Sequence, residues 1–349
     1  MKKIKLFLAA YINYPNAQNV NCEHIARYID KNKFEIHAMY TDKMPIDKAK
    51  YEAMGIHLHR LIHHRFIWYW SKLWSMWRTN ADVYYIPKTE IMDEKFMNHF
   101  SGRGKKFVSS IEGVVGEQIA ADDERQRGYF EKCDGVFSIS RCIQESTEKC
   151  WDMKTPVIYL GVDEPAIEIK EKHRIQNVIW IGSVIERKRP DYLLECAKRF
   201  PELNFTMVGD GDQSKRIEER IQNEGLINVS MTGRIQNEKV YELLSEADLL
   251  LMTSDKEGLP KVIGEAMTMG VPAVYMNECY DVDYIENGCN GYGVATLNEM
   301  IQIVHELLYN PEKYQQLSKK ARESIQPYLW SNLIHQYEEY FDNLMQNGI

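Results

Sequence analysis

The sequence predicts an α/β protein with two doubly wound parallel sheets in succession. Strand-like apolar runs alternate with segments of helical periodicity along the chain, which favours sheets covered by helices over a β-sandwich or a helical bundle. The 349 residues exceed one typical hydrophobic core and suit two domains of about 150 to 170 residues each. The alternation also restarts near Asn177, after a charged segment at Glu164 to Arg174 that we interpret as the linker.

The expected strands follow from runs of apolar and β-branched residues between turn signals. In the first half they are Ile4 to Ala10, Glu35 to Tyr40, Val83 to Ile86, Lys106 to Ile111, Gly135 to Ser140 and Val157 to Leu160. In the second half they are Asn177 to Gly182, Asn204 to Gly209, Val229 to Met231, Leu249 to Met252 and Pro272 to Tyr275.

A helix is expected at the end of the chain. Aromatic residues recur there at helical spacing, namely Tyr328, Trp330, Tyr337, Tyr340 and Phe341. The expected organisation is therefore one domain at residues 1–165, a second at 166–326 and a terminal helix at 327–349.

Composition and charge exclude several classes of protein. The formal net charge of −8 argues against a dedicated nucleic-acid binder, so no nucleic acid partner is expected. The seven cysteines are scattered and form no Cys-x-x-Cys pair, which is typical of reduced thiols in the cytoplasm. The apolar run after Met1 is short and is broken by Lys5, so we interpret it as a strand and not as a signal peptide. No stretch reaches the roughly 18 to 20 apolar residues of a membrane-spanning helix.

Two glutamates eight positions apart, Glu257 and Glu265, form the most informative motif. The run from Leu249 has the composition of a buried parallel strand, and Pro260 suits the first turn of the following helix. Both carboxylates are then expected at one crevice, because open parallel sheets bind ligands beyond the carboxyl ends of their strands. The free N–H groups at the helix start attract phosphate. The structural alternative is an ordinary strand and amphipathic helix with two solvated glutamates.

This segment resembles the signature of the retaining, nucleotide-sugar-dependent glycosyltransferases of family 4, which have the GT-B fold. The match continues through Glu265-Ala266-Met267 and Gly270-Val271-Pro272. The resemblance implies two Rossmann-like doubly wound domains facing across a cleft, with the C-terminal helix crossing back to the first domain. It covers Asn177 to about Trp330 by motif, and the first half by architecture alone.

The resemblance also implies the donor site. Arg187 and Lys188, between a strand and a helix, are expected to neutralise the diphosphate leaving group, although a solvated basic loop is the structural alternative. Many relatives carry Arg where this chain has Ser183. Gly209-Asp210-Gly211 is expected to be mainly a turn, and Arg234 follows the glycine where relatives hold the nucleobase. Tyr284 to Gly291 is interpreted as a structural turn near the donor.

The two glutamates receive different roles from the resemblance. Glu265 is expected to bind the ribose hydroxyls, and Glu257 to meet the donor sugar or the reacting face. The backbone between them is expected to bind phosphate and sugar, through Gly258, Leu259, Pro260, Lys261 and Val262. The catalytic residues would thus be Glu257, Arg187 and Lys188.

The resemblance further implies that no protein base, metal or other cofactor is needed. In enzymes of this kind the leaving phosphate helps to deprotonate the acceptor, and cationic side chains and the helix terminus hold the diphosphate in place of a metal. Asp281-Val282-Asp283 imitates the Asp-x-Asp motif of metal-dependent transferases of another fold but lacks further ligands.

The first half carries fewer signals, as suits a domain that recognises an acceptor. Asn16 and Asn19 occupy the turn after the first strand and are expected to line the crevice. Glu112 either orients an acceptor hydroxyl or caps a turn, since a carboxylate at a strand end serves either purpose. His24 is interpreted as a packing residue.

The segment from Arg60 to Arg78 mixes basic residues with four of the seven tryptophans. A basic, tryptophan-rich helix suits a membrane interface and hence a lipid-linked acceptor. We prefer the alternative of a partly buried helix whose aromatic side chains form core and whose basic residues are solvated, because the aromatics occupy more than one helical face.

Together these observations predict a metal-independent, retaining hexosyltransferase that moves a sugar from a nucleotide donor, a UDP-sugar rather than a GDP-sugar, to a saccharide or lipid-linked saccharide. Synthesis of a surface polysaccharide or glycan, in the cytoplasm or at the inner face of the membrane, is the expected setting. The alternatives are another GT-B activity, such as a nucleotide-sugar epimerase, and a non-catalytic nucleotide-sugar-binding scaffold.

Overall fold

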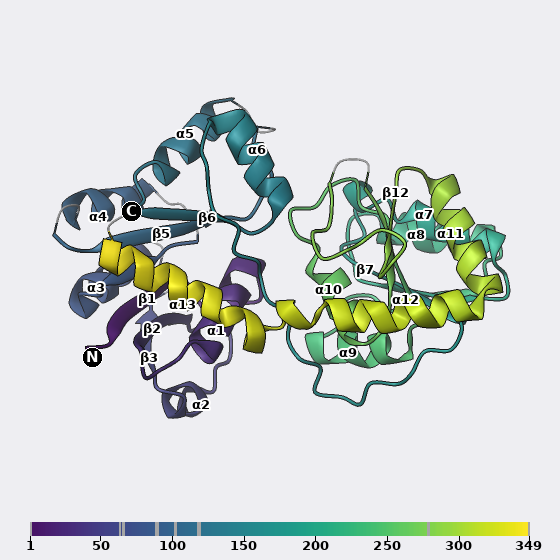
Figure 1. The fold of residues 1–349 in the computed structure, drawn as a ribbon, viewed down its shortest axis with the longest axis horizontal. Coiled ribbons are helices and arrows are strands. Elements are labelled where there is room, and N and C mark those ends of the chain that lie inside the picture. The colour runs from purple at the N-terminus through teal and green to yellow at the C-terminus, as the bar shows by residue number, and fades with distance from the viewer. Residues whose placement is uncertain are drawn as a thin grey trace. The chain divides into compact units, whose positions relative to one another are not determined.

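The computed structural model describes residues 2–62, 64, 67–87, 91–100, 103–116, 120–277 and 280–347. Contacts within it divide the chain into two compact units, Met1–Gly161 with Trp330–Ile349, and Val162–Leu329. The sequence places these boundaries after residues 165 and 326. Each unit contains a six-stranded sheet with helices on both faces (Figure 1).

The sheet of the first unit has the strand order β3-β2-β1-β4-β5-β6, and its neighbouring strands are parallel. The strands are β1 (Ile4–Tyr11), β2 (Phe34–Thr41), β3 (Ile56–Leu61), β4 (Val83–Tyr85), β5 (Lys106–Ile111) and β6 (Gly135–Ser138). The helices are α1 (Ala17–Tyr28), α2 (Lys48–Ala53), α3 (Trp68–Thr79), α4 (Ile91–Phe100), α5 (Ala120–Phe130), α6 (Arg141–Trp151) and α13 (Trp330–Asn347).

The sheet of the second unit has the order β12-β11-β10-β7-β8-β9 and is also parallel. Its strands are β7 (Asn177–Ile181), β8 (Asn204–Val208), β9 (Val229–Met231), β10 (Leu249–Met252), β11 (Ala273–Met276) and β12 (Tyr292–Val294). Its helices are η1 (Glu186–Lys188), α7 (Asp191–Arg199), α8 (Ser214–Asn223), α9 (Asn237–Glu246), α10 (Lys261–Thr268), α11 (Leu297–Tyr309), α12 (Pro311–Ser324) and η2 (Gln326–Tyr328).

Each sheet has one point at which the strand order reverses. It lies between β1 and β4 in the first unit and between β7 and β10 in the second. The connections on the two sides of such a point leave in opposite directions, so a crevice opens beyond the carboxyl ends of the two strands. In open parallel sheets, ligands bind at such points.

The structure corrects the predicted strands at both edges. The strands β3 and β12 were not predicted, and Val157 to Leu160 forms only an isolated bridge between Val157 and Ser138. Strand β3 has the sequence Ile-His-Leu-His-Arg-Leu, in which polar and apolar residues alternate because it lies at a sheet edge. Strand β12 has three residues, too few for a pattern.

The terminal helix α13 returns to the first unit, as predicted, and packs beside α1 (Figure 1). The Glu338 carboxylate accepts a hydrogen bond of 2.8 Å from the Asp30 N–H, and the Tyr337 hydroxyl donates one of 3.0 Å to the Tyr159 carbonyl. Phe341 packs edge-on against Phe34 of β2. The face of the sheet that contains Phe34 is therefore covered by α13.

Candidate functional site

Two loops flank the reversal point of the second sheet. The first leaves β7 at Gly182 and passes through η1, which contains Arg187 and Lys188. The second leaves β10 and passes Glu257 before α10 begins. Because β7 and β10 are parallel neighbours, their carboxyl ends lie at the same edge of the sheet and the two loops meet.

Hydrogen bonds hold the two loops together. The Trp180 indole N–H donates to the Thr253 hydroxyl at 2.8 Å, and that hydroxyl donates to the Lys188 carbonyl at 2.6 Å. The Asp255 N–H donates to the Arg187 carbonyl at 2.9 Å. Thr253 is fully buried, so its bonds are protected from water. These hydrogen bonds thereby fix the positions of the two loops, which carry the charged side chains of Arg187, Lys188 and Glu257.

Two cations meet one carboxylate at this point. Arg187 Nη1 lies 3.2 Å from Glu257 Oε1, and Lys188 Nζ forms a closer ion pair with the same oxygen. The side chains of Glu257 and Lys188 are only 15% and 14% exposed, whereas Arg187 is 48% exposed. Residues predicted separately as diphosphate ligands and as a sugar-facing carboxylate thus form one partly buried cluster.

Helix α10 begins directly after this cluster. Pro260 precedes its first residue and offers no side-chain cap, while its carbonyl accepts a hydrogen bond of 3.0 Å from the Ile263 N–H. The buried Tyr284 hydroxyl donates to the Pro260 carbonyl at 2.8 Å and fixes the turn. Glu265 is the fifth residue of α10, one and a half turns into the helix as predicted. A side chain at Gly264 would come within 2.6 Å of Val162, so only glycine fits there.

The turns that follow β8 and β9 are set mainly by backbone geometry. Gly209 has a φ of +135°, and a side chain there would overlap the Gly182 carbonyl. Gly211 similarly approaches the Val184 carbonyl. Both glycines are required by close approach of the backbone after β7 and β8, which confirms the expected turn. Ser183 and Arg234 are exposed at the ends of β7 and β9.

One residue beside the cluster was not predicted. Tyr280 is 4% exposed, and its hydroxyl has no hydrogen-bond partner among the described residues. Burial, and then the nearby Glu257 carboxylate, raise the pKa of Tyr280 well above its usual value. A tyrosine in a loop has no periodic pattern, so sequence alone gave no signal for it. Asp281 of the Asp-x-Asp motif accepts a hydrogen bond of 2.8 Å from the Tyr275 hydroxyl.

The first unit has a pocket of about 610 Å³ at its own reversal point. It is lined by residues from the turn after β1, from Pro87 and from the loop after β5, and these include Asn16 and Glu112. The buried Tyr85 hydroxyl lies 2.8 Å from Ser110 Oγ, and Ser110 donates to Glu112 at 3.0 Å. The Glu112 carboxylate is therefore positioned by a chain of hydrogen bonds that begins at the buried Tyr85 hydroxyl and passes through Ser110.

Asn19 differs from its prediction. It is fully buried and accepts a hydrogen bond of 3.1 Å from the Tyr11 N–H, so it braces the turn and does not line this pocket. Asn16 caps α1 by accepting from the Asn19 N–H at 3.0 Å. His24 stacks on Trp330 with ring centroids 5.3 Å apart, in agreement with a packing role.

The tryptophan-rich segment also differs from the preferred interpretation. Arg60 belongs to β3, and α3 begins at Trp68; three residues of the segment, His63, Arg65 and Phe66, lie outside the described ranges. Three of the four tryptophans are not core, since Trp70, Trp74 and Trp77 are 63%, 60% and 55% exposed, whereas Trp68 is half-buried.

The lysine of α3 was expected to be solvated, but it is buried. Lys72 is buried and pairs with the buried Asp93 of α4 at 2.7 Å. Three of the tryptophans thus face solvent, whereas Lys72 and the Tyr69 hydroxyl, which donates to Asp93 at 3.4 Å, fix the helix from within. Within the described ranges, no helix is long and apolar enough to cross a bilayer.

Residues 165–324 match the model of the family described as glycosyl transferases group 1. N-acetyl-alpha-D-glucosaminyl L-malate synthase of Bacillus anthracis is 31% identical over 269 residues, which cover 70% of this chain and 69% of that protein. An uncharacterized glycosyltransferase of Methanocaldococcus jannaschii is 21% identical over 213 residues, and the match spans 60% of the length of each protein.

The fold also has solved counterparts. The crystal structure of Anabaena HepE in complex with UDP and glucose has a TM-score of 0.76 and 18% identity, and it covers 98% of this chain and 100% of HepE. This similarity shows the fold alone. Two Rossmann-like parallel-sheet domains of the GT-B class are thus confirmed.

Proposed function

The chain belongs to the family of glycosyl transferases group 1, and from this premise we propose that it moves a sugar from a nucleotide-sugar donor to a saccharide or lipid-linked saccharide. The observation that carries the proposal is the cluster of Arg187, Lys188 and Glu257 at the reversal point of the second sheet. A UDP-sugar is favoured as donor, since HepE was crystallised with UDP and with UDP-glucose.

The diphosphate is held by Arg187, Lys188 and the start of α10 in this proposal. A departing diphosphate gains negative charge, and cations already fixed beside it stabilise that charge without reorganising. The N–H groups of Gly258, Leu259, Lys261 and Val262 add partial positive charge at the helix terminus, whereas Pro260 has no N–H and only shapes the turn. Ser183 adds a hydroxyl at the position where many family members carry Arg.

The two glutamates bind the ribose and the transferred sugar of the donor. Glu265 accepts hydrogen bonds from the ribose, and the backbone after β9, at Gly233 and Arg234, holds the base. Glu257 meets the sugar. Because Glu257 pairs with both cations, a diphosphate would compete for them and free the carboxylate for sugar hydroxyls.

Transfer with retention follows if the acceptor attacks from the face that the diphosphate leaves. The leaving phosphate then takes the acceptor proton, so the reaction needs no protein base and no divalent cation at the diphosphate. The pocket containing Asn16 and Glu112 binds the acceptor, with the Glu112 carboxylate accepting from an acceptor hydroxyl. We assign the product to a surface polysaccharide or glycan.

The exposed tryptophans of α3 favour an acceptor that lies at a membrane surface. Indole side chains partition to the headgroup level of a bilayer, and Trp70, Trp74 and Trp77 are more than half exposed. The buried ion pair of Lys72 with Asp93 holds α3 in place, so the tryptophans stay outward. We therefore propose peripheral binding of this face to the cytoplasmic side of a membrane that carries a lipid-linked acceptor.

The donor site is tested with a panel of nucleotide sugars, measuring thermal stabilisation and slow donor hydrolysis. A donor at 100 times its dissociation constant adds about 2.7 kcal/mol to the free energy of unfolding. The expected result is stabilisation by one UDP-sugar, with hydrolysis lost in Glu257→Ala. Glu186→Ala, in the same loop but exposed, is the matched control and should retain hydrolysis. Turnover that persists after Mg²⁺ is omitted would support the metal-independent step.

Three outcomes separate the alternatives. Binding without turnover in any acceptor mixture would favour a scaffold. Conversion of the donor sugar to an epimer without acceptor would favour an epimerase. Stabilisation by no nucleotide or nucleotide sugar would contradict the donor site itself.

Membrane binding is tested by sedimentation with anionic vesicles. Trp70→Ser, Trp74→Ser and Trp77→Ser combined should abolish co-sedimentation while leaving the thermal midpoint unchanged, because these side chains are exposed. Ile227→Ser is the control, since Ile227 is fully exposed on the second unit. If the triple variant sediments like the unmodified chain, α3 is not the membrane face.

A further inference from the structure

Four polar side chains gather on one face of the first sheet, on the neighbouring strands β2 and β3. His37 and His57 are register partners in the parallel pair. Since side chains alternate with a period of two along a strand, Glu35 shares the face of His37, and His59 shares the face of His57. Phe34, of opposite parity, lies on the other face against α13.

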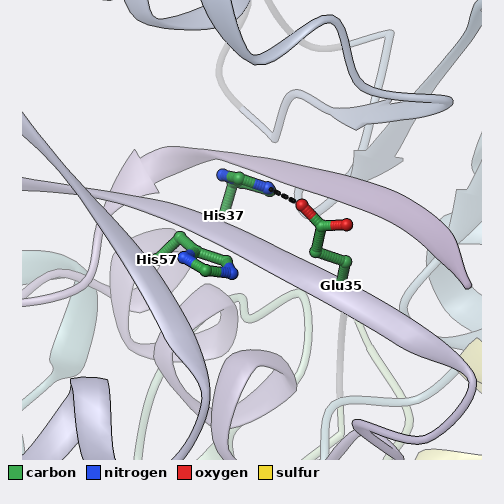
Figure 2. Close-up of side chains that lie close together, drawn as sticks. All are labelled: Glu35, His37 and His57. Atoms are coloured by element: carbon green, nitrogen blue, oxygen red, sulfur yellow. Dashed lines mark hydrogen bonds and ion pairs between the residues drawn. The ribbon is translucent and has the colours of Figure 1, made fainter.

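Three of these side chains present possible metal ligands close together. One donor atom each from Glu35, His37 and His57 lies within 4.8 Å of the others. Figure 2 shows the three side chains together, with the His37 ring directed at the Glu35 carboxylate. The His37 Nε2 to Glu35 Oε1 distance is 3.0 Å, and the rings of His37 and His57 have centroids 4.8 Å apart.

His59 holds the other side of the His37 ring. His37 Nδ1 lies 2.9 Å from His59 Nε2. When the proton is on Nδ1 and is donated to His59, the Nε2 lone pair faces the carboxylate, and only a cation between them makes that arrangement favourable. A partner that fixes the second ring nitrogen is typical of metal-bound histidines. The other tautomer donates Nε2–H to Glu35, so a proton and a metal ion compete for one position.

A pocket beside the cluster leaves room for a water ligand, and charged residues that line it would favour or oppose a bound cation. The cluster borders a pocket of about 690 Å³, which is also lined by Lys5, Glu52 and Arg78. Lys5 Nζ is 3.5 Å from Glu35 Oε1 and is 32% exposed on its side chain, so a bound cation would displace it toward solvent. Arg78 opposes a cation, whereas Glu52 favours one.

We infer that Glu35, His37 and His57 bind one divalent transition-metal ion of the zinc class, with water completing the shell and His59 orienting His37. Two imidazoles and a carboxylate suit zinc, whereas Mg²⁺ and Ca²⁺ prefer oxygen ligands alone. Tetrahedral zinc needs donor atoms about 3.3 Å apart, from bonds of about 2.0 to 2.1 Å. The required closure falls on His57, whose exposed ring stacks on the His37 ring and would have to turn toward the ion. The ion would join the edge strand β3 to β2.

The test is a calorimetric titration of the chelator-treated, tag-free full chain with Zn²⁺, repeated with Mg²⁺, and a Co²⁺ absorption spectrum. One equivalent of Zn²⁺, no uptake of Mg²⁺ and the intense visible bands of four- or five-coordinate Co²⁺ are expected. Because Cys150 is an exposed thiol, the titration is also run in Cys150→Ser, where binding should persist. Loss of the equivalent in that variant would overturn the site.

Variants separate this site from general histidine binding. His57→Gln should weaken Zn²⁺ binding at least about 100-fold, and His59→Phe, which removes the orienting partner, about tenfold. His305→Gln, an exposed histidine of α11, is the matched control and should bind as the unmodified chain does. The chelator-treated His57→Gln chain should keep its thermal midpoint, which excludes unfolding. No stoichiometric uptake, or equal losses in His57→Gln and His305→Gln, would refute the inference.

Discussion

At the scale of single residues, the structure adds a buried tyrosine hydroxyl, that of Tyr280, to the residues found from sequence motifs. Tyr280 lies beside Glu257, is 4% exposed and has no hydrogen-bond partner among the described residues. The motif residues Arg187, Lys188 and Glu257 were predictable because they stand in the order of a known family motif, and the structure brings them together. Their roles stay predictions. Tyr280 was not predictable, since its place depends on how its loop folds over the cluster.

Replacing Tyr280 by phenylalanine should separate stability from donor binding. An unsatisfied buried polar group costs about 1 to 3 kcal/mol, so Tyr280→Phe should leave the free energy of unfolding unchanged or raise it by about 1 kcal/mol. If the hydroxyl meets the donor sugar, affinity for the donor should fall about tenfold, which is roughly the value of one hydrogen bond. Urea unfolding and donor titration measure the two effects. Tyr314→Phe is the control, because its hydroxyl donates to the Asp248 carbonyl and its loss should destabilise.

At the scale of elements, the burial of a strand decided whether it could be predicted from the sequence. The central strands β1, β5, β7 and β10 were found within a residue or so of their bounds, because strands buried on both faces read as continuous apolar runs. The edge strand β3 was missed although Glu35-Ile36-His37 and His57-Leu58-His59 alternate with the period of a strand. The same alternation was the available signal for the histidine cluster, and reading it required knowing that β2 and β3 pair.

The contact between α7 and α8 should make stability depend on pH. Asp191 at the start of α7 accepts hydrogen bonds from Arg216 at 2.6 and 2.8 Å and from Arg220 at 2.7 Å. The Arg216 bonds, and then those of Arg220, lower the pKa of Asp191 from 3.8 to about 2. A lowered pKa stabilises the folded state above the unfolded value, and this contribution is lost as the pH falls from 3.8 toward 2.

The corresponding variant is Asp191→Asn. Solvent reaches this carboxylate, so the loss at pH 7 should be about 1 kcal/mol after screening, and the difference from the unmodified chain should shrink below pH 4. Urea midpoints at several pH values measure it. Glu323→Gln, at an exposed carboxylate on α12, should show no such loss. A difference that is the same at pH 7 and pH 3 would contradict the assignment to the Asp191 charge.

At the scale of the whole molecule, two separate cores predict two unfolding events. The sequence indicated this duplication because the strand and helix alternation restarts, and the structure gives each unit its own sheet. Multidomain chains depart from two-state unfolding. In scanning calorimetry we expect two transitions, with UDP raising the one that belongs to Val162–Leu329 and Zn²⁺ raising the other. A single transition that shifts with either ligand would show that the units unfold together.

The return of α13 to the first unit reverses the usual order of events during synthesis. Residues 162–329 form a continuous unit, whereas the unit that is translated first lacks the helix that covers Phe34 until residues 330–347 have been made. At about 5 to 20 residues per second, the ribosome needs roughly 10 to 30 s to translate the second unit. During that time the face of the nascent first sheet that contains Phe34 lacks its covering helix, so we expect chaperones to bind the chain at this stage.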